Sequence, residues 1–296
     1  MKRKNIIIVC DGDFPTAKQP LKVLRDAVGK STAGKNAADK DATCKCNGII
    51  IACDGTAVNL AKHGFTPDYI VGDMDTLSAA NQKKYKNLIH KNSSRENNDQ
   101  TKAFEFALKL IREEVKAAAA KSVAAKSIAA TSTLQTQYKI FIIGATGKRE
   151  DHTLGNISLL ADYAEILKKK FSAKATADKR KFVTQKCDPN NITVEMITDY
   201  GIFTPFTDSF KISARKGEQI SFFAFDPTLC IKSEGLVYPL DSVKFDMWWK
   251  ATLNEFAPCN NVKAAAGNRK AAARGSKTIA ELKFNHPAKV LVFRKF

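Results

Sequence analysis

Three segments in the first half of the chain carry residues suited to binding a metal-bound polyphosphate. Carboxylates hold Mg²⁺, glycines let backbone N–H groups approach phosphate oxygens, and Arg and Lys neutralise phosphate charge. Their co-occurrence predicts an enzyme that acts on a nucleotide. The segments are 71–75 (Val-Gly-Asp-Met-Asp), 98–102 (Asn-Asp-Gln-Thr-Lys) and 144–152 (Gly-Ala-Thr-Gly-Lys-Arg-Glu-Asp-His).

Polar residues also stand directly after apolar runs that predict buried strands. In open parallel sheets, ligands bind beyond the carboxyl ends of the strands, so we expect these residues to gather at one edge. Asp73 and Asp75 are so close in sequence that their repulsion needs a metal ion or a base to offset it. The pairs of run and residue are 48–53 with Asp54, 69–71 with Asp73 and Asp75, and 138–143 with Gly144 and Gly147.

Each of these residues also has a purely structural interpretation. An aspartate after a strand is typical of a turn or a helix N-cap, and we expect Asp99 to cap a helix that begins at Thr101. His152 could act as a general base, but its position at the start of a helix favours a local hydrogen bond. Their joint occurrence favours one shared site over separate turns.

The two halves of the chain differ in their pattern. In the first half, short Ile- and Val-rich runs alternate with patterns typical of amphipathic helices. The clearest of these helices begins at Thr101, and a second spans 153–169. This alternation predicts an α/β domain with a mainly parallel sheet. From residue 191, short β-like runs such as 192–197 follow one another without long helices. That pattern predicts an antiparallel sandwich or barrel.

These patterns predict a two-domain organisation. We expect an α/β catalytic domain over 1–170, a linker over 171–188 and a β-sandwich over 189–296. Segments rich in Ala, Lys, Ser and Thr are typical of disordered loops or helical extensions, and Ala favours the helix. These apparent insertions lie near 30–47, 116–135, 169–187 and 263–277.

The formal net charge of +18 invites a nucleic-acid interpretation. Most of the excess lies in Lys-rich stretches at 116–133, 168–186 and 264–277, and aromatic residues are not interleaved with it. A nucleic-acid-binding protein is therefore the weaker alternative, and we expect no nucleic-acid partner.

Compartment and membrane contact are predicted from the cysteines and the apolar runs. The seven cysteines include no C-x-x-C pair, which favours reduced thiols in a cytoplasm over a secreted disulfide framework. No apolar run is long enough to span a bilayer, so we expect no membrane partner. The first apolar run ends at Asp11 and Asp13 and predicts a strand, not a targeting peptide.

The segment 66–77 resembles the P-D-x-x-x-G-D-x-D-S-L signature of thiamine pyrophosphokinases. Five further segments resemble that family in the same order along the chain. They are 54–57 (D-G-G-A), 98–102 (D-x-T), 144–156 (G-A-x-G-x-R-x-D-H-x-x-x-N), 234–240 (G-L-x-W/Y-P-L) and 253–255 (S-N-E).

The resemblance implies an α/β catalytic domain, a C-terminal β-sandwich and a homodimer with active sites between the subunits. It implies transfer of diphosphate from Mg²⁺-bound ATP to the hydroxyethyl group of thiamine, which gives thiamine diphosphate and AMP. Alternatives are a diphosphokinase with another acceptor or a nucleotide hydrolase on the same scaffold, and a non-catalytic thiamine or nucleotide sensor.

The resemblance also implies roles for particular residues. Asp73, Asp75 and Asp99 would hold the metal and, together with Arg149, form the catalytic set. Lys102 departs from the family pattern, since many relatives have Asp there, so a carboxylate is missing. The implied ATP-binding residues are Asp54, Gly55, Gly144, Thr146, Gly147, Asp151, His152 and Asn156, and the implied thiamine-binding residues are Tyr238, where many relatives have Trp, and Asn254.

Overall fold

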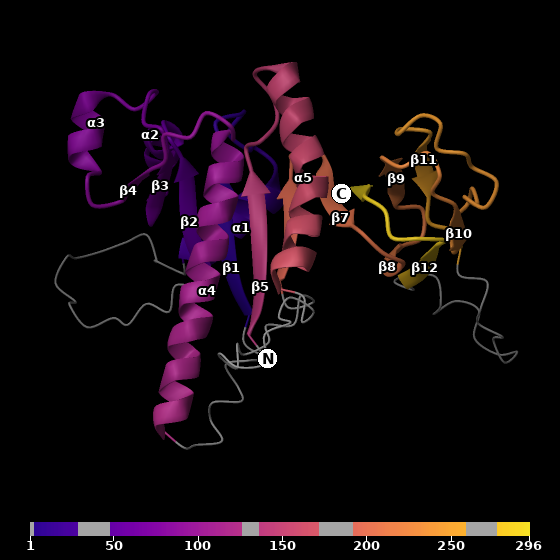
Figure 1. Ribbon diagram of the computed structural model, residues 1–296. Coiled ribbons are helices and arrows are strands. Elements are labelled where there is room, and N and C mark those ends of the chain that lie inside the picture. The colour runs from indigo at the N-terminus through magenta and orange to yellow at the C-terminus, as the bar shows by residue number, and fades with distance from the viewer. Residues whose placement is uncertain (1–2, 29–47, 126–135, 172–191, 259–276) are drawn as a thin grey trace, which may run out of the picture. The chain divides into compact units, whose positions relative to one another are not determined.

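The computed structural model describes residues 3–28, 48–125, 136–171, 192–258 and 277–296 (Figure 1). The chain divides into two compact units, which are described separately. The first comprises Met1–Leu159 and Ile166–Asp199, and the second comprises Leu160–Glu165 and Tyr200–Phe296. Apart from residues 169–171 and 277, the predicted linker 171–188 and the predicted insertions at 30–47, 169–187 and 263–277 lie outside the described residues.

The first unit is built on a parallel sheet with the strand order β6-β5-β1-β2-β3-β4. Its central strands are almost continuously apolar, and Ile7, Ile8 and Ile51 are fully buried. Strands that are covered on both faces have this composition, so the predicted α/β architecture is confirmed. The strands are β1 (Arg3–Val9), β2 (Gly48–Cys53), β3 (Tyr69–Gly72), β4 (Ile89–Lys91), β5 (Gln137–Ile143) and β6 (Ile192–Ile197).

The sheet to which β6 belongs differs from the prediction. This strand pairs in parallel with β5, with Val194 opposite Ile140, whereas we expected the run 192–197 to belong to the antiparallel second half. Along β6, Ile192, Val194 and Met196 are buried, and the residues between them are exposed or half-buried. Such alternation is typical of any half-exposed strand, so it did not reveal which sheet the strand joins.

Helices connect the strands of the first unit, and α4 differs from the prediction at its start. Asn98 Oδ1 accepts a hydrogen bond from the Thr101 amide at 2.9 Å, so Asn98 is the N-cap and not Asp99. Asp99 occupies the first turn, where a carboxylate interacts favourably with the helix dipole.

The helices are α1 (Lys18–Val28), α2 (Thr56–Lys62), α3 (Ala79–Lys84), α4 (Asp99–Ala125) and α5 (Glu150–Phe171). Part of the predicted insertion at 116–135 therefore prolongs α4, as its Ala content favours.

The strands of the second unit form a β-sandwich, as predicted, and its remaining segment, Leu160–Glu165, belongs to α5. One antiparallel sheet has the order β11-β9-β13-β7, and the other has the order β10-β12-β8. Phe222 of β9, Leu282 of β12 and Val292 of β13 are buried in the apolar core of this unit. The strands are β7 (Gly201–Phe206), β8 (Phe210–Arg215), β9 (Gln219–Ala224), β10 (Ile231–Glu234), β11 (Ala251–Glu255), β12 (Lys277–Phe284) and β13 (Val290–Lys295).

The described residues bear on two further predictions. Within the ranges given above, no helix combines the length and the apolar character that crossing a bilayer requires. The described cysteines, Cys10, Cys53 and Cys230, all carry free thiols.

The sandwich core predicts a large stability difference between two substitutions. Phe222→Ala should lower the free energy of unfolding of the second unit by about 3–5 kcal/mol, because a fully buried aromatic side chain leaves a cavity. Ile279→Ala, at a side chain of β12 that is 61% exposed, should change it by less than about 0.5 kcal/mol. Both tryptophans, Trp248 and Trp249, lie in this unit, so fluorescence during urea unfolding reports on it. Equal losses would contradict the assigned core.

Candidate functional site

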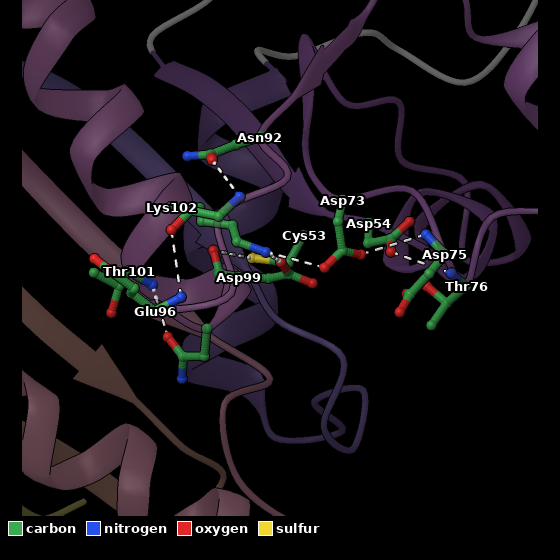
Figure 2. A network of polar contacts seen from close by, with 12 residues as sticks. Cys53, Asp54, Asp73, Asp75, Thr76, Asn92, Glu96, Asp99, Thr101 and Lys102 are labelled. Carbon is green, nitrogen blue, oxygen red and sulfur yellow. Dashed lines mark hydrogen bonds and ion pairs between the residues drawn. The ribbon is translucent and has the colours of Figure 1, made fainter.

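Three carboxylates meet where β2 and β3 end. The side chains of Asp54, Asp73 and Asp75 each offer an oxygen, and these oxygens lie within 4.8 Å of one another (Figure 2). Like charges at this separation repel unless a cation lies among them. An all-oxygen set of this kind suits a hard divalent ion such as Mg²⁺.

Asp54 provides an independent test of whether a cation fits this cluster. Its side chain is only 2% exposed, and its Oδ1 atom is buried without a hydrogen-bond partner. The other oxygen, Oδ2, accepts from the Thr76 amide at 3.3 Å. Burial raises the pKa of Asp54 above its ordinary value. A buried carboxylate oxygen without a donor is costly, and a metal ligand bond would satisfy it, so the residues fit Mg²⁺.

Two residues in the loops of this cluster have backbone conformations that residues with a side chain rarely adopt. Asp54 has φ 40° and Met74 has φ 67°, which is the left-handed region. Each such residue costs about 1–3 kcal/mol and is maintained by its surroundings. Gln82 Nε2 donates to the Met74 carbonyl at 2.9 Å and also to the Leu77 carbonyl at 2.8 Å, and the Gly55 amide donates to Thr76 Oγ1 at 3.1 Å. These bonds hold the acidic loops in place.

Asp99 and Lys102 extend the polar network from the first turn of α4. The Lys102 ammonium Nζ lies 2.9 Å from Asp99 Oδ1 and 3.2 Å from Asp73 Oδ2 (Figure 2). Burial opposes the charge on Lys102, but hydrogen bonds to the two carboxylates outweigh it and raise the pKa of the lysine. The same ion pair lowers the pKa of Asp73. The structure thus groups Asp54 with Asp73 and Asp75, and it pairs Asp99 with a lysine.

The glycine-rich loop after β5 packs against the loop after β1. The Gly12 amide donates to the Gly144 carbonyl at 2.7 Å, and the Asp13 amide donates to the Thr146 carbonyl at 2.9 Å. Gly147 has φ +83°, and a Cβ atom added to it would lie 2.0 Å from Asp13 Oδ2. The positive φ favours glycine at position 147, and a side chain there would displace that of Asp13, whatever its contact with a phosphate.

Asn156 of α5 fixes this loop to the start of α4. Its Nδ2 atom donates to the Ala145 carbonyl at 2.8 Å, and its Oδ1 atom accepts from Asn98 Nδ2 at 2.9 Å. The Asn156 carbonyl accepts from Gln100 Nε2 at 3.0 Å. Asn156 therefore positions the site through both ends of its amide.

Arg149, Asp151 and His152 lie on the surface at the start of α5. Arg149 forms a two-point ion pair with Asp151, with distances of 2.6 and 3.1 Å. This pairing lowers the pKa of Asp151. Asp151 thus orients the Arg149 guanidinium, and His152 is exposed beside them.

Sequence analysis did not assign two aspartates to the site. Asp11 and Asp13 follow β1, which lies between β5 and β2 in the sheet. Lys148, with φ 58°, reaches Asp11 with its Nζ atom at 3.0 Å. The rule that found Asp54 after β2 would have identified Asp11 and Asp13 if it had been applied to the first strand.

In the second unit, a buried amide supports an exposed aromatic ring. The Tyr238 side chain is 64% exposed, whereas Asn254 is buried. Asn254 Oδ1 accepts from the Tyr238 amide at 3.2 Å, and its Nδ2 atom donates to the Tyr238 carbonyl at 2.7 Å. Leu253, with φ 60°, precedes it at a register shift of β11. Asn254 therefore fixes the backbone that carries Tyr238.

Two family models match the chain. One is described as thiamin pyrophosphokinase, catalytic domain, and matches residues 41–173. The other is described as thiamin pyrophosphokinase, substrate-binding domain, and matches residues 201–267. No curated protein sequence matches the chain.

Solved structures share the fold of this chain at low sequence identity. Thiamine pyrophosphokinase from Bacillus subtilis is 17% identical with a TM-score of 0.59, and the match covers 99% of both chains. Thiamin pyrophosphokinase from Candida albicans is 15% identical with a TM-score of 0.59, over 99% of this chain and 89% of that one. Yeast thiamin pyrophosphokinase is 13% identical with a TM-score of 0.59, over 99% and 86%. At such identities, the likeness concerns the fold.

The unpartnered oxygen of Asp54 predicts a loss of metal response in Asp54→Asn. Mg²⁺ at roughly 100 times its dissociation constant should raise the melting temperature of the wild type by about 5–10 °C. The variant should respond by less than about 2 °C. Without Mg²⁺ it should be no less stable than the wild type, because the substitution removes a repulsive buried charge.

The measurement is a thermal melt with and without Mg²⁺. Asp26→Asn, at an exposed position of α1, is the matched control and should respond like the wild type. A full Mg²⁺ response in Asp54→Asn would remove Asp54 from the metal site.

Proposed function

The chain belongs to the thiamin pyrophosphokinase family, and we propose on this premise that it transfers diphosphate from Mg²⁺-bound ATP to the hydroxyethyl group of thiamine. The products are thiamine diphosphate and AMP. The observation that carries this proposal is the match of both family models, catalytic and substrate-binding, in chain order. The acidic cluster at the ends of β2 and β3 supplies chemistry suited to the reaction.

Asp54, Asp73 and Asp75 are the residues that would hold the magnesium ion. When bound, the ion neutralises charge on the phosphate oxygens. The loops carrying these aspartates are held by Gln82 and Thr76, so the carboxylates are oriented before the nucleotide arrives. Preorganisation matters here because phosphoryl transfer depends mostly on positioning and charge neutralisation.

The transfer proceeds in our proposal by in-line attack of the thiamine hydroxyl on the β-phosphorus. A bond forms between the hydroxyl oxygen and that phosphorus, and the bond from the phosphorus to the oxygen of AMP breaks. A carboxylate of the acidic cluster accepts the hydroxyl proton. Arg149, held by Asp151 at the start of α5, adds positive charge for the phosphates.

The acceptor is assigned to the second unit, where Tyr238 exposes its ring. Thiamine carries a cationic thiazolium, and a cation over an aromatic face is favourable. We further propose a homodimer in which the active sites lie between subunits, so that Tyr238 serves its partner's acidic site. A cytoplasmic location stays a prediction from the cysteine content.

An assay of AMP release distinguishes this function from its alternatives. Purified protein with Mg²⁺ and ATP should release AMP only when thiamine is added, with thiamine diphosphate identified by mass. Asp73→Asn should lower the rate by at least about 100-fold, because the charge-stabilising metal site loses a ligand. Far-ultraviolet circular dichroism should show that this variant stays folded.

Other outcomes of this assay each support a named alternative. Release of AMP or ADP that is indifferent to thiamine would indicate a hydrolase or another acceptor. Binding of ATP without turnover would indicate a sensor. Full activity of Asp73→Asn would contradict the assigned metal site.

The proposed contact of Tyr238 with thiamine leads to a prediction about the KM for thiamine. Tyr238→Ala should raise the KM for thiamine by about 2- to 30-fold, which corresponds to losing a cation–π contact, and leave the KM for ATP unchanged. Tyr238→Phe keeps the ring and should stay within about twofold of the wild type. Equal changes in both KM values, or none, would contradict the role of Tyr238.

A further inference from the structure

Lys102 is a buried cation inside the acidic site. Its side chain is only 3% exposed, although it stands in the first turns of α4, near the start of the helix. Lysine is almost never so buried unless it is paired. Its ammonium contacts Asp99 of the same helix and Asp73 of the loop after β3, a residue 29 positions away in sequence (Figure 2).

The two partners of Lys102 are the kind of groups that a divalent ion would bridge. Asp73 Oδ2 faces the ammonium at 3.2 Å, and Asp73 also contributes to the three-carboxylate cluster. Asp99 offers Oδ1 to the same ammonium at 2.9 Å. A lysine ammonium is a compact point charge with three donors, so it can join two carboxylates much as a metal ion does.

We propose that Lys102 is a built-in cation that replaces a second divalent ion between Asp73 and Asp99. The chain then binds one divalent ion, at Asp54, Asp73 and Asp75. Lys102 in this sense neutralises part of the charge on Asp73, a carboxylate that it shares with the ion beside it. The inference rests on the metal site of the proposed function, but it does not depend on the identity of the acceptor.

A simple structural role for Lys102 would have different consequences. If Lys102 only linked α4 to the loop after β3, its replacement would lower stability without changing how many metal ions bind. If it takes the place of an ion, a carboxylate at position 102 creates a second metal site between Asp73 and Asp99. The number of bound ions therefore separates the two roles.

The experiment counts Mn²⁺ ions bound to the full chain without nucleotide, by the electron paramagnetic resonance signal of free Mn²⁺. The wild type should bind one Mn²⁺ per chain tightly, and Lys102→Asp should bind two. Lys109→Asp is the matched control, since this lysine is also on α4, is 66% exposed and undergoes the same change of charge. It should bind one.

A second variant keeps the test decisive if Lys102→Asp does not fold. Lys102→Gln removes the ammonium without adding a ligand, so it should still bind one Mn²⁺. It should bind it at least several-fold more tightly, because a positive charge beside Asp73 has been removed. An unchanged affinity in Lys102→Gln would overturn the inference.

The outcomes separate failure of this inference from failure of the proposed function. Two tightly bound Mn²⁺ ions in the wild type, or one in a folded Lys102→Asp, would overturn the role of Lys102 and leave the metal site standing. No bound Mn²⁺ in the wild type would overturn the metal site itself, and the inference with it.

Discussion

Repulsion between carboxylates gathered at one edge of the parallel sheet is the constraint on which the site depends. Asp54, Asp73 and Asp75 lie within reach of a single cation, and Asp99 stands close enough to share Lys102 with Asp73. Folding must bring these charges together although burial penalises the charge on Asp54, as its raised pKa indicates. Ionic attraction within the chain relieves part of this cost, and the proposed divalent ion would relieve more of it. The clustered carboxylates therefore lower the stability of the fold where a ligand would need their charge, as is common at functional sites.

The loops that carry the charge are held mainly by neutral groups. The loop after β5 is bonded to the loop after β1 through backbone amides and carbonyls, and a Cβ atom added to Gly12 would lie 2.3 Å from the backbone carbonyl oxygen of Thr146. Backbone pairing of this kind needs no charged residue, so it does not add to the electrostatic load. Because the central strands are buried on both faces, the strand ends that anchor these loops are fixed.

Most of the fold could be predicted from sequence, because its signals are local. The strands β1, β2 and β5 are apolar runs, and the helices have an amphipathic period, so the α/β class followed directly. The sheet to which β6 belongs could not be predicted, since Ile192, Val194 and Met196 alternate as in any half-exposed strand. Asn98 and Asp99 are equally good caps by type, and only the backbone geometry decides between them. Lys102 appeared in the sequence as a missing carboxylate, because its contact with Asp73 exists only after folding.

Side-chain amides recur at the positions that fix functional residues in both units. Gln82 holds the loop of Asp73 and Asp75, Asn156 holds the glycine-rich loop, and Asn254 holds the backbone of Tyr238. An amide has both donors and an acceptor, and it remains neutral at any physiological pH. A carboxylate or a lysine in place of Asn254 could bond only one of the two Tyr238 backbone groups, and a charged residue in place of Gln82 or Asn156 would alter the charge around the acidic loops of the first unit. The neutral amides therefore set geometry, while the charged side chains, among them the aspartates, Lys102 and Arg149, set the field that a polyphosphate would meet.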